Sequence, residues 1–392
     1  MRRLIQSVVG VVAAGMLVGG CPPMDMMPDN SNSGGNDNQS QNSSNVNGNM
    51  SLPSNSNSSN DNGTANENSN SANENDNAEP DKPIPDPRVF GDGSAGSRVI
   101  TGNVRVTGAD ANLQYTDFLI EQGATFTVQS GAVIRCSGTF ENYGTIIVEQ
   151  GADGGTRGGL DSSTVVGVVR EPTSGIATQA AASGEVGGSS SGRAGGSEGQ
   201  GLSEFEARQT LRVGVNAGGP GAAGDLPGGA GGGSLLVIAG GEIMNDGTIE
   251  APGGNGVDGS GAGGGGVVIL AAKEKITNTS TAMIMATGGA GGEATNAIGP
   301  GGGGGGGIVH MIAPEIDDQG TTMIDGGAAG PSGEADSITA EMRSGGGGGG
   351  ATAGNGGSGG GIPGGLPGTP NAAGDGDPGF MLHTIADPTA LL

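Results

Sequence analysis

The first candidates for chemistry are acidic residues that lie close together in the last third of the chain. Glu315, Asp317 and Asp318 are near neighbours, with Asp325 further along. Paired carboxylates supply the acid and the base or nucleophile of glycoside hydrolysis. Two basic residues precede this group, Lys273 and Lys275. Asp317 and Asp318 stand just before a glycine, where acids are ordinary solvated turn residues, so we predict no catalytic cluster here.

Histidine and cysteine offer little further chemistry. His310 and His383 are the only histidines and are far apart in the sequence, so no histidine-based metal cluster or triad can be built from sequence neighbours. The only cysteines are Cys21 and Cys136. If Cys21 is modified, no partner remains for a disulfide, and Cys136 is predicted to be a small buried core residue.

One glycine-rich stretch, GGNGVD from Gly253 to Asp258, begins like the calcium-binding nonapeptide repeat. It occurs once, and Ser260 stands where that repeat has a large apolar residue. Such repeats bind calcium between consecutive copies, so we predict no metal site at Asp258. The many GxGxxG matches lack the βαβ unit that a dinucleotide site needs. No cofactor is predicted.

The composition excludes nucleic-acid binding and argues against an ordinary globular core. The chain has 392 residues, of which 89 are Gly and none is Trp, and aromatic residues make up 2%. Its 15 basic residues against 40 acidic ones give a net charge of −25, whereas phosphate contacts require Lys or Arg. Because large aromatic side chains are so few, the core must be formed by thin layers of small aliphatic side chains, as in a narrow repeated stack.

The first 21 residues, MRRLIQSVVGVVAAGMLVGGC, contain two arginines, an apolar stretch and then small residues. They resemble a bacterial lipoprotein signal peptide, in which a lipobox ends in an invariant cysteine. The resemblance implies a signal peptide over residues 1–20 and acyl chains on Cys21 that attach the protein to a membrane. The alternative is an ordinary secretory signal in which the cysteine has no role.

A linker and then a folded region follow. Residues 21–88 are mostly Asn, Ser, Asp and Gly, which predicts a disordered tether, with an extended, proline-stiffened entry near its end. We predict a folded domain over residues 89–392, interrupted by an irregular insertion at 156–215. Within that insertion, Ser203 and Glu206 have the spacing of a capping box and predict a short helix. The C-terminal Phe380, Met381, Leu382 and Ile385 predict a last strand or cap.

Self-similarity predicts the fold class. Between residues 231 and 330 a short apolar strand, a turn, a second strand and a glycine-rich loop recur three times, as in a solenoid. Short strands over residues 98–151 would also suit an antiparallel sandwich. The recurrence of GTFENYGTIIV as GEIMNDGTIE favours a right-handed parallel β-helix. Asn142 and Asn245 occupy matching places, where they could form a ladder or hold turns, and we favour turns. The glycine loops are either flexible or closely stacked.

The lipobox, the Asn-rich tether and the GGGGGGGIVHMIAP unit together resemble glycine-rich β-helix surface proteins of Gram-negative bacteria, and more loosely the passenger domains of adhesins. The resemblance implies a lipid-anchored, non-catalytic structural or adhesive protein at the outer membrane or cell surface. Its expected partners are the membrane, through Cys21, and glycans or extracellular matrix. The alternatives are a carbohydrate-active β-helix enzyme, which needs converging acids on a strand face, and ice or mineral binding by a flat repetitive face.

Overall fold

The computed structural model describes residues 85–107, 111–157, 165–166, 184, 195–209, 218–224, 226–295, 298–332, 344–350, 353–362 and 369–391. The predicted signal peptide, Cys21 and the tether as far as residue 84 lie outside these residues, as does most of the predicted insertion. Among the helices that are described, none has the length and apolar character needed to span a membrane.

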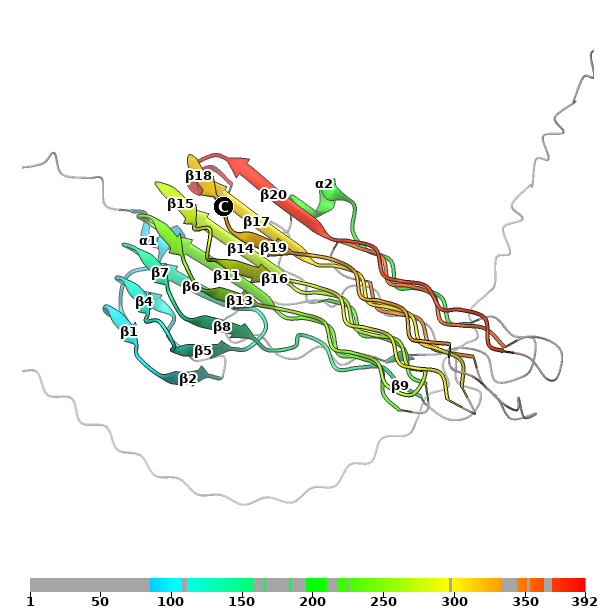
Figure 1. Cartoon of the computed structure of the whole chain (residues 1–392). Helices are drawn as coiled ribbons and strands as arrows, with labels where there is room; N and C mark the ends of the chain where they lie inside the picture. Colours follow the sequence, from blue (N-terminus) through cyan, green and yellow to red (C-terminus); the bar gives the residue numbers. More distant parts are fainter. Residues whose placement is uncertain are drawn as a thin grey trace, which may run out of the picture. The chain divides into compact units, whose positions relative to one another are not determined.

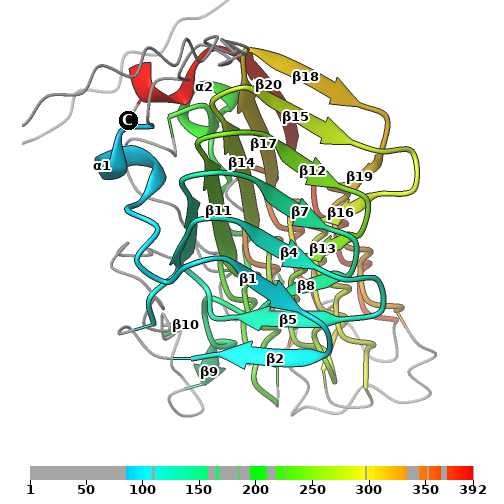
Figure 2. The same ribbon diagram turned by 90° about the vertical axis from the view of Figure 1, so that its left-hand side faces the viewer.

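The chain folds as a parallel β-helix built from three six-stranded parallel sheets. Each coil contributes one strand to each sheet, so successive strands stack (Figure 2). Sheet 1 contains β1 (Arg98–Ile100), β4 (Phe118–Ile120), β7 (Phe140–Asn142), β12 (Ile243–Asn245), β15 (Lys275–Asn278) and β18 (Glu315–Asp318). Sheet 2 contains β2 (Asn103–Val106), β5 (Thr125–Val128), β8 (Thr145–Val148), β13 (Thr248–Glu250), β16 (Met283–Met285) and β19 (Thr321–Met323). Sheet 3 contains β3 (Gln114–Tyr115), β6 (Ala132–Cys136), β11 (Ser234–Ala239), β14 (Val267–Ala272), β17 (Ile308–Ala313) and β20 (Phe380–Ile385).

The fold follows from the period-two pattern of sheets 1 and 2 and the continuous apolar pattern of sheet 3. In β5 and β8 alternate residues are buried, whereas every residue of β11, β14 and β17 is buried. Strands covered on both faces are expected to be apolar throughout. The inner core includes a stacked pair of rings, Phe118 and Phe140, whose centroids are 5.6 Å apart. The predicted parallel solenoid and its C-terminal strand, β20, are confirmed.

A second apolar cluster covers the outer face of sheet 3. Phe90, the last residue of helix α1 (Pro87–Phe90), is fully buried in it. The extended entry expected at these prolines is therefore wrong at Pro87, because Asp86 caps a helical turn and Pro87 takes a position where the helix needs no amide donor. Helix α2 (Glu204–Ala207) contributes Ala207, and the predicted capping box between Ser203 and Glu206 is confirmed.

Two short antiparallel strands leave the solenoid after β8. They are β9 (Thr156–Arg157) and β10 (Val165–Val166), which pair with each other. A 3-10 turn, η1 (Pro388–Ala390), follows β20 near the end of the chain.

A buried polar column runs through sheet 1 and corrects the expectation for Asn142 and Asn245. The Nδ2 amide of each Asn donates to the side-chain oxygen of the next residue in the column, at 2.8 Å in each case: Asn142 to Asn245, Asn245 to Asn278, and Asn278 to Asp318. Asn142 also accepts a turn hydrogen bond from the Gly144 amide at 3.2 Å. Parallel, in-register stacking forms a ladder that satisfies amides in an otherwise apolar core.

The described parts of the glycine loops are closely stacked and form what we call the glycine bundle, which comprises the described residues of the segments that connect sheet 2 to sheet 3 after β8, β13, β16 and β19 (Figure 1). Every third amide of one segment donates to a parallel neighbour: Gly288 to Asp325, Gly291 to Ala328 and Ala294 to Pro331. The amides one residue further along donate to an antiparallel neighbour: Gly289 to Gly263 and Gly292 to Ser260. The third set of positions includes Ala290 and Glu293, which are exposed residues, and the Ala290 amide donates to Asn255 Oδ1 at 2.9 Å.

A repeat of three residues with negative φ is the geometry of the polyproline II helix. Among the described glycines of the bundle, only Gly259 has a positive φ, 73°. Glycine is therefore required here mainly because a Cβ atom would not fit, and less because of the backbone conformation. A Cβ atom on Gly304 would lie 1.9 Å from the carbonyl oxygen of Gly263, and one on Gly348 would lie 1.9 Å from that of Gly303. The bundle is held by backbone hydrogen bonds between segments that approach too closely for side chains.

His310 gives the protein a testable acid sensitivity. Its side chain is 1% exposed on the outer face of sheet 3, and Nε2 lies 2.8 Å from the Thr384 hydroxyl. Burial, Arg208 and His383 lower the pKa of His310 to about 4. Because the unfolded chain binds this proton more tightly, stability falls as the pH drops from about 6.5, by about 3 kcal/mol at pH 4.

Urea denaturation at pH 7 and pH 4 measures this loss. We expect the stability of His310→Gln to fall about 3 kcal/mol less than that of the wild type between the two pH values. The wild type must be compared with His310→Gln because many carboxylates also change protonation between pH 7 and pH 4. An equal loss in both proteins would show that His310 does not contribute.

Candidate functional site

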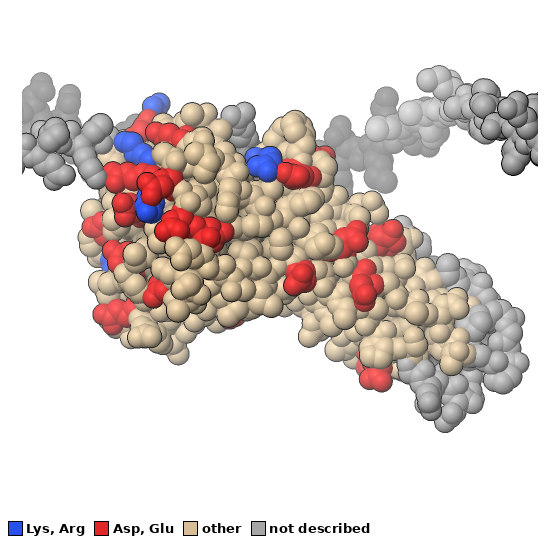
Figure 3. Space-filling view, turned by 45° about the horizontal axis from the view of Figure 1, so that its top comes forward, with Lys and Arg blue, Asp and Glu red and all other residues tan. Residues whose placement is uncertain are grey.

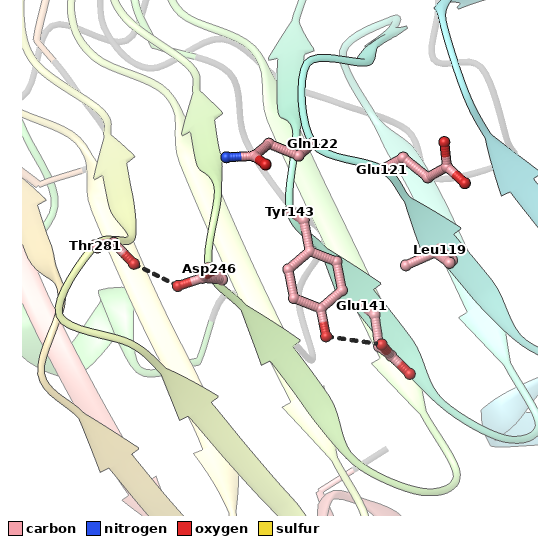
Figure 4. Close-up of a pocket in the computed structure, with 7 residues that line it drawn as sticks. All are labelled: Leu119, Glu121, Gln122, Glu141, Tyr143, Asp246 and Thr281. Carbon is pink, nitrogen blue, oxygen red and sulfur yellow. Dashed lines mark hydrogen bonds between the residues drawn. The ribbon is translucent and has the colours of Figure 1, made fainter.

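One surface feature is a depression of about 560 Å³ where sheet 1 turns into sheet 2. Its lining comes from four successive coils: Leu119, Glu121, Gln122, Glu141, Tyr143, Asp246 and Thr281. Figure 4 shows the ring of Tyr143 in the centre, with Gln122 above it, Asp246 and Thr281 on one side and Glu141 on the other. We call this feature the corner pocket.

Tyr143 is held at the corner by its own turn and by the neighbouring strands. It follows the ladder residue Asn142, and its amide donates to the Ile120 carbonyl at 2.9 Å. Its hydroxyl donates to Glu141 Oε2 at 3.0 Å and contacts Met244 Sδ at 3.1 Å. Desolvation, the hydrogen bond to Glu141 and the nearby negative charges raise the pKa of Tyr143. The phenol is therefore neutral at physiological pH.

Asp246 occupies the equivalent turn one coil further on. Its carboxylate accepts hydrogen bonds from the Thr279 and Thr281 hydroxyls of the next turn. These two hydroxyls lower the pKa of Asp246. The pocket thus contains ionised or polar acceptors and one aromatic ring, and no Lys, Arg, His or Cys lines it.

A second surface, the outer face of sheet 2, is regular and mostly uncharged. Pairing in register places a column along it that is small and polar except at Met283: Asn103, Thr125, Thr145, Thr248, Met283 and Thr321. The neighbouring outward column contains Arg105, Thr127, Ile147, Glu250, Met285 and Met323. Threonine and aliphatic side chains dominate this face, and acids do not converge on it.

The structure does not bring the predicted acidic candidates together into a catalytic group. Glu315 forms a 2.6 Å ion pair with Lys275, and Asp317 accepts from Gln319 at 3.0 Å. Asp318 ends the polar column. Asp325 belongs to the glycine bundle, where its carbonyl accepts from Gly288, and Lys273 lies 5.9 Å from the centre of the Phe90 ring. Each of these residues has a structural contact of its own.

The remaining candidates also occupy separate places. The Nε2 atom of His383 lies 3.1 Å from Asp318 Oδ2. His310 is buried on the outer face of sheet 3. Cys136 is buried in the core as predicted, and burial raises the pKa of its thiol. Asp258 has a positive φ, 46°, at the end of a bundle segment. Among the described residues, no three His, Cys, Asp or Glu side chains form a group suited to a metal ion.

Sequence reasoning missed the corner pocket, although one signal for it was present. The recurring turn that follows Asn142 and Asn245 carries Tyr143 in one coil and Asp246 in the next. In-register stacking of that turn is what places the two side chains side by side. No protein-family model, characterised protein or solved structure matches the chain, so its function must be argued from these surfaces.

Proposed function

We propose that this protein is a lipid-anchored, non-enzymatic module that acts at the outer membrane or cell surface of a Gram-negative bacterium, in a structural or adhesive role. The observation that carries the proposal is the long, regular outer face of sheet 2, where threonine and aliphatic side chains repeat from coil to coil. A rigid repetitive face suits contact with an extended partner better than it suits catalysis. The lipobox ending at Cys21 supports the anchor.

The glycine bundle supports a surface location in a second way. The described residues of its segments after β13, β16 and β19 include no Lys or Arg, and those of the segment after β8 include Arg157 in β9 and Arg208 at the end of α2. Figure 3 shows acidic side chains scattered over the described part of the bundle. An acidic surface keeps such a large exposed backbone structure soluble and gives no attraction to nucleic acid.

A carbohydrate-active enzyme has less support. The corner pocket contains three carboxylates, Glu121, Glu141 and Asp246. A glycosidase of the common type needs one carboxyl held protonated by an apolar environment. The pKa of Asp246 is shifted in the opposite direction, because the Thr279 and Thr281 hydroxyls lower it. Glu141 accepts a hydrogen bond from the Tyr143 hydroxyl at 3.0 Å.

Acyl labelling tests the anchor. We expect cells that express the full chain and are fed an alkyne fatty acid to yield a labelled protein in the outer-membrane fraction. Globomycin and Cys21→Ala should each abolish the processed, labelled form. Cys136→Ala is the matched control and should label normally, because Cys136 is buried in the core. If the wild-type protein is not labelled, the proposed lipid anchor and the proposed location are both wrong.

A further inference from the structure

The corner pocket presents the face of an aromatic ring at the bottom of a polar depression. Figure 4 shows the Tyr143 ring lying across the centre of the pocket, with the polar side chains arranged around its edge. The ring cannot swing freely, because its hydroxyl contacts Glu141 and Met244 and its amide is bonded to Ile120. A fixed aromatic face on a half-buried residue is a platform for a flat ligand that has both apolar and polar sides.

The acceptors around the ring are already selective for hydroxyl donors. The chain's own hydroxyls occupy them: Tyr143 on Glu141, and Thr279 and Thr281 on Asp246. A ligand with adjacent hydroxyls can add to these carboxylates without breaking the existing bonds, because each carboxylate has several acceptor positions. Gln122 adds both a donor and an acceptor, so a ligand oxygen can also be bound.

Charge narrows the ligand class. The pocket has three carboxylates and no cationic side chain, so sulfated, phosphorylated or uronic-acid groups would be repelled. A cationic ligand would be attracted, but the carboxylates already bind neutral hydroxyls and form no ion pair within the described chain. A neutral polyhydroxylated ligand matches both the ring face and the bonds that the acceptors make.

The dimensions of the pocket fit a segment of a longer chain. Its volume of about 560 Å³ lies within the range of small-molecule sites, about 300–1,000 Å³. The lining crosses four coils, a distance of roughly 14 Å for strands about 4.8 Å apart. We propose that the corner pocket binds a neutral sugar unit of a glycan, with the C–H face of the sugar on Tyr143 and its hydroxyls on Glu141, Asp246 and Gln122. This inference rests on the adhesive role proposed above and names its ligand.

Tyrosine fluorescence provides a direct binding measurement, because the chain contains two Tyr and no Trp, and the other tyrosine, Tyr115, is buried in the core. The full chain is titrated with cellotetraose, maltotetraose and mannotetraose, and binding is checked by calorimetry. We expect at least one of these neutral sugars to bind. Tyr143→Ala should weaken its affinity by about tenfold or more, and Tyr143→Phe by less than about threefold. Phe205→Ala, which removes an aromatic ring that is 71% exposed on α2, is the matched control.

Three outcomes would overturn the proposal: no neutral sugar binds, Tyr143→Ala binds as well as wild type, or only polylysine binds in a Tyr143-dependent way. The last result would assign the pocket to a cationic partner. Attachment of whole cells to glycan-coated and matrix-coated surfaces separates this inference from the general function. If cells with Tyr143→Ala attach as wild type while cells without the protein do not, the pocket assignment fails and the adhesive role stands. Equal attachment without the protein would contradict the adhesive role itself.

Discussion

Gly303→Ala is expected to destabilise the glycine bundle by about 3 kcal/mol or more. A Cβ atom at this position would lie 2.0 Å from the carbonyl oxygen of Gly327 and 2.7 Å from its carbonyl carbon. Both are backbone atoms, so no side chain can rotate away to make room. The Gly303 amide donates to Gly374 at 3.0 Å, and its carbonyl accepts from Gly357 at 2.7 Å. Moving Gly303 away from Gly327 would therefore strain its hydrogen bonds with Gly374 and Gly357, which lie further along the same connection.

Hydrogen exchange measured by mass spectrometry locates the effect, and urea denaturation gives its size. Exchange should increase in peptides that cover the bundle, such as 299–307, while β5 and β8 in the solenoid stay protected. Gly102→Ala is the matched control, because a Cβ there meets no atom within 4 Å and the backbone φ is not positive. That substitution should be neutral or stabilise the protein by up to about 1 kcal/mol. Equal, small effects at both positions would mean that the segments are not closely packed.

The sequence predicts the solenoid well because its strands have a side-chain pattern. Alternation in Thr125–Val128 and Thr145–Val148 and the apolar Leu235–Ala239 segment specify strands, and the recurrence of these segments specifies stacking. The glycine bundle has no such pattern, because glycine has no side chain that could mark a buried or exposed position. The clearest trace of its three-residue period is the stretch TGGAGGE, in which glycine pairs separate Thr287, Ala290 and Glu293; Ala290 and Glu293 are exposed and Thr287 is half-buried.

Contacts between coils were harder to predict than the coils themselves. Asn142 and Asn245 are 103 residues apart, and Asn245 and Asn278 are 33 apart, so a ladder depends on insertions of very different length leaving the register unchanged. A hydrogen bond within its own turn could account for each Asn separately, so the turn was preferred over the ladder. The corner pocket depends on the same stacking, since its lining extends from Leu119 to Thr281. The sequence contains these residues but does not show that they meet.

Asn245→Leu is expected to cost about 3 kcal/mol, although the two side chains are similar in size. Asn245 is fully buried and is the middle member of the polar column. Its loss leaves the Asn142 amide without its 2.8 Å acceptor and the Asn278 oxygen without its donor. Each buried polar group left without a partner costs about 1–3 kcal/mol. Thr277→Ala, on the outward side of the same sheet, should change stability by less than about 0.5 kcal/mol.

The triple variant Asn142→Leu, Asn245→Leu, Asn278→Leu separates a hydrogen-bonded column from three independent core positions. If the ladder is real, removing every amide together leaves Asp318 Oδ1, the Gly144 amide and the Thr248 carbonyl without the partners they had in the column. The triple variant should then lose about as much stability as Asn245→Leu alone, because replacing both partners of a buried hydrogen bond is far less costly than orphaning one. Urea denaturation of the three single variants and the triple variant measures this difference. Additive losses would show that each Asn acts alone, as a turn residue would, and that the column does not couple one coil to the next.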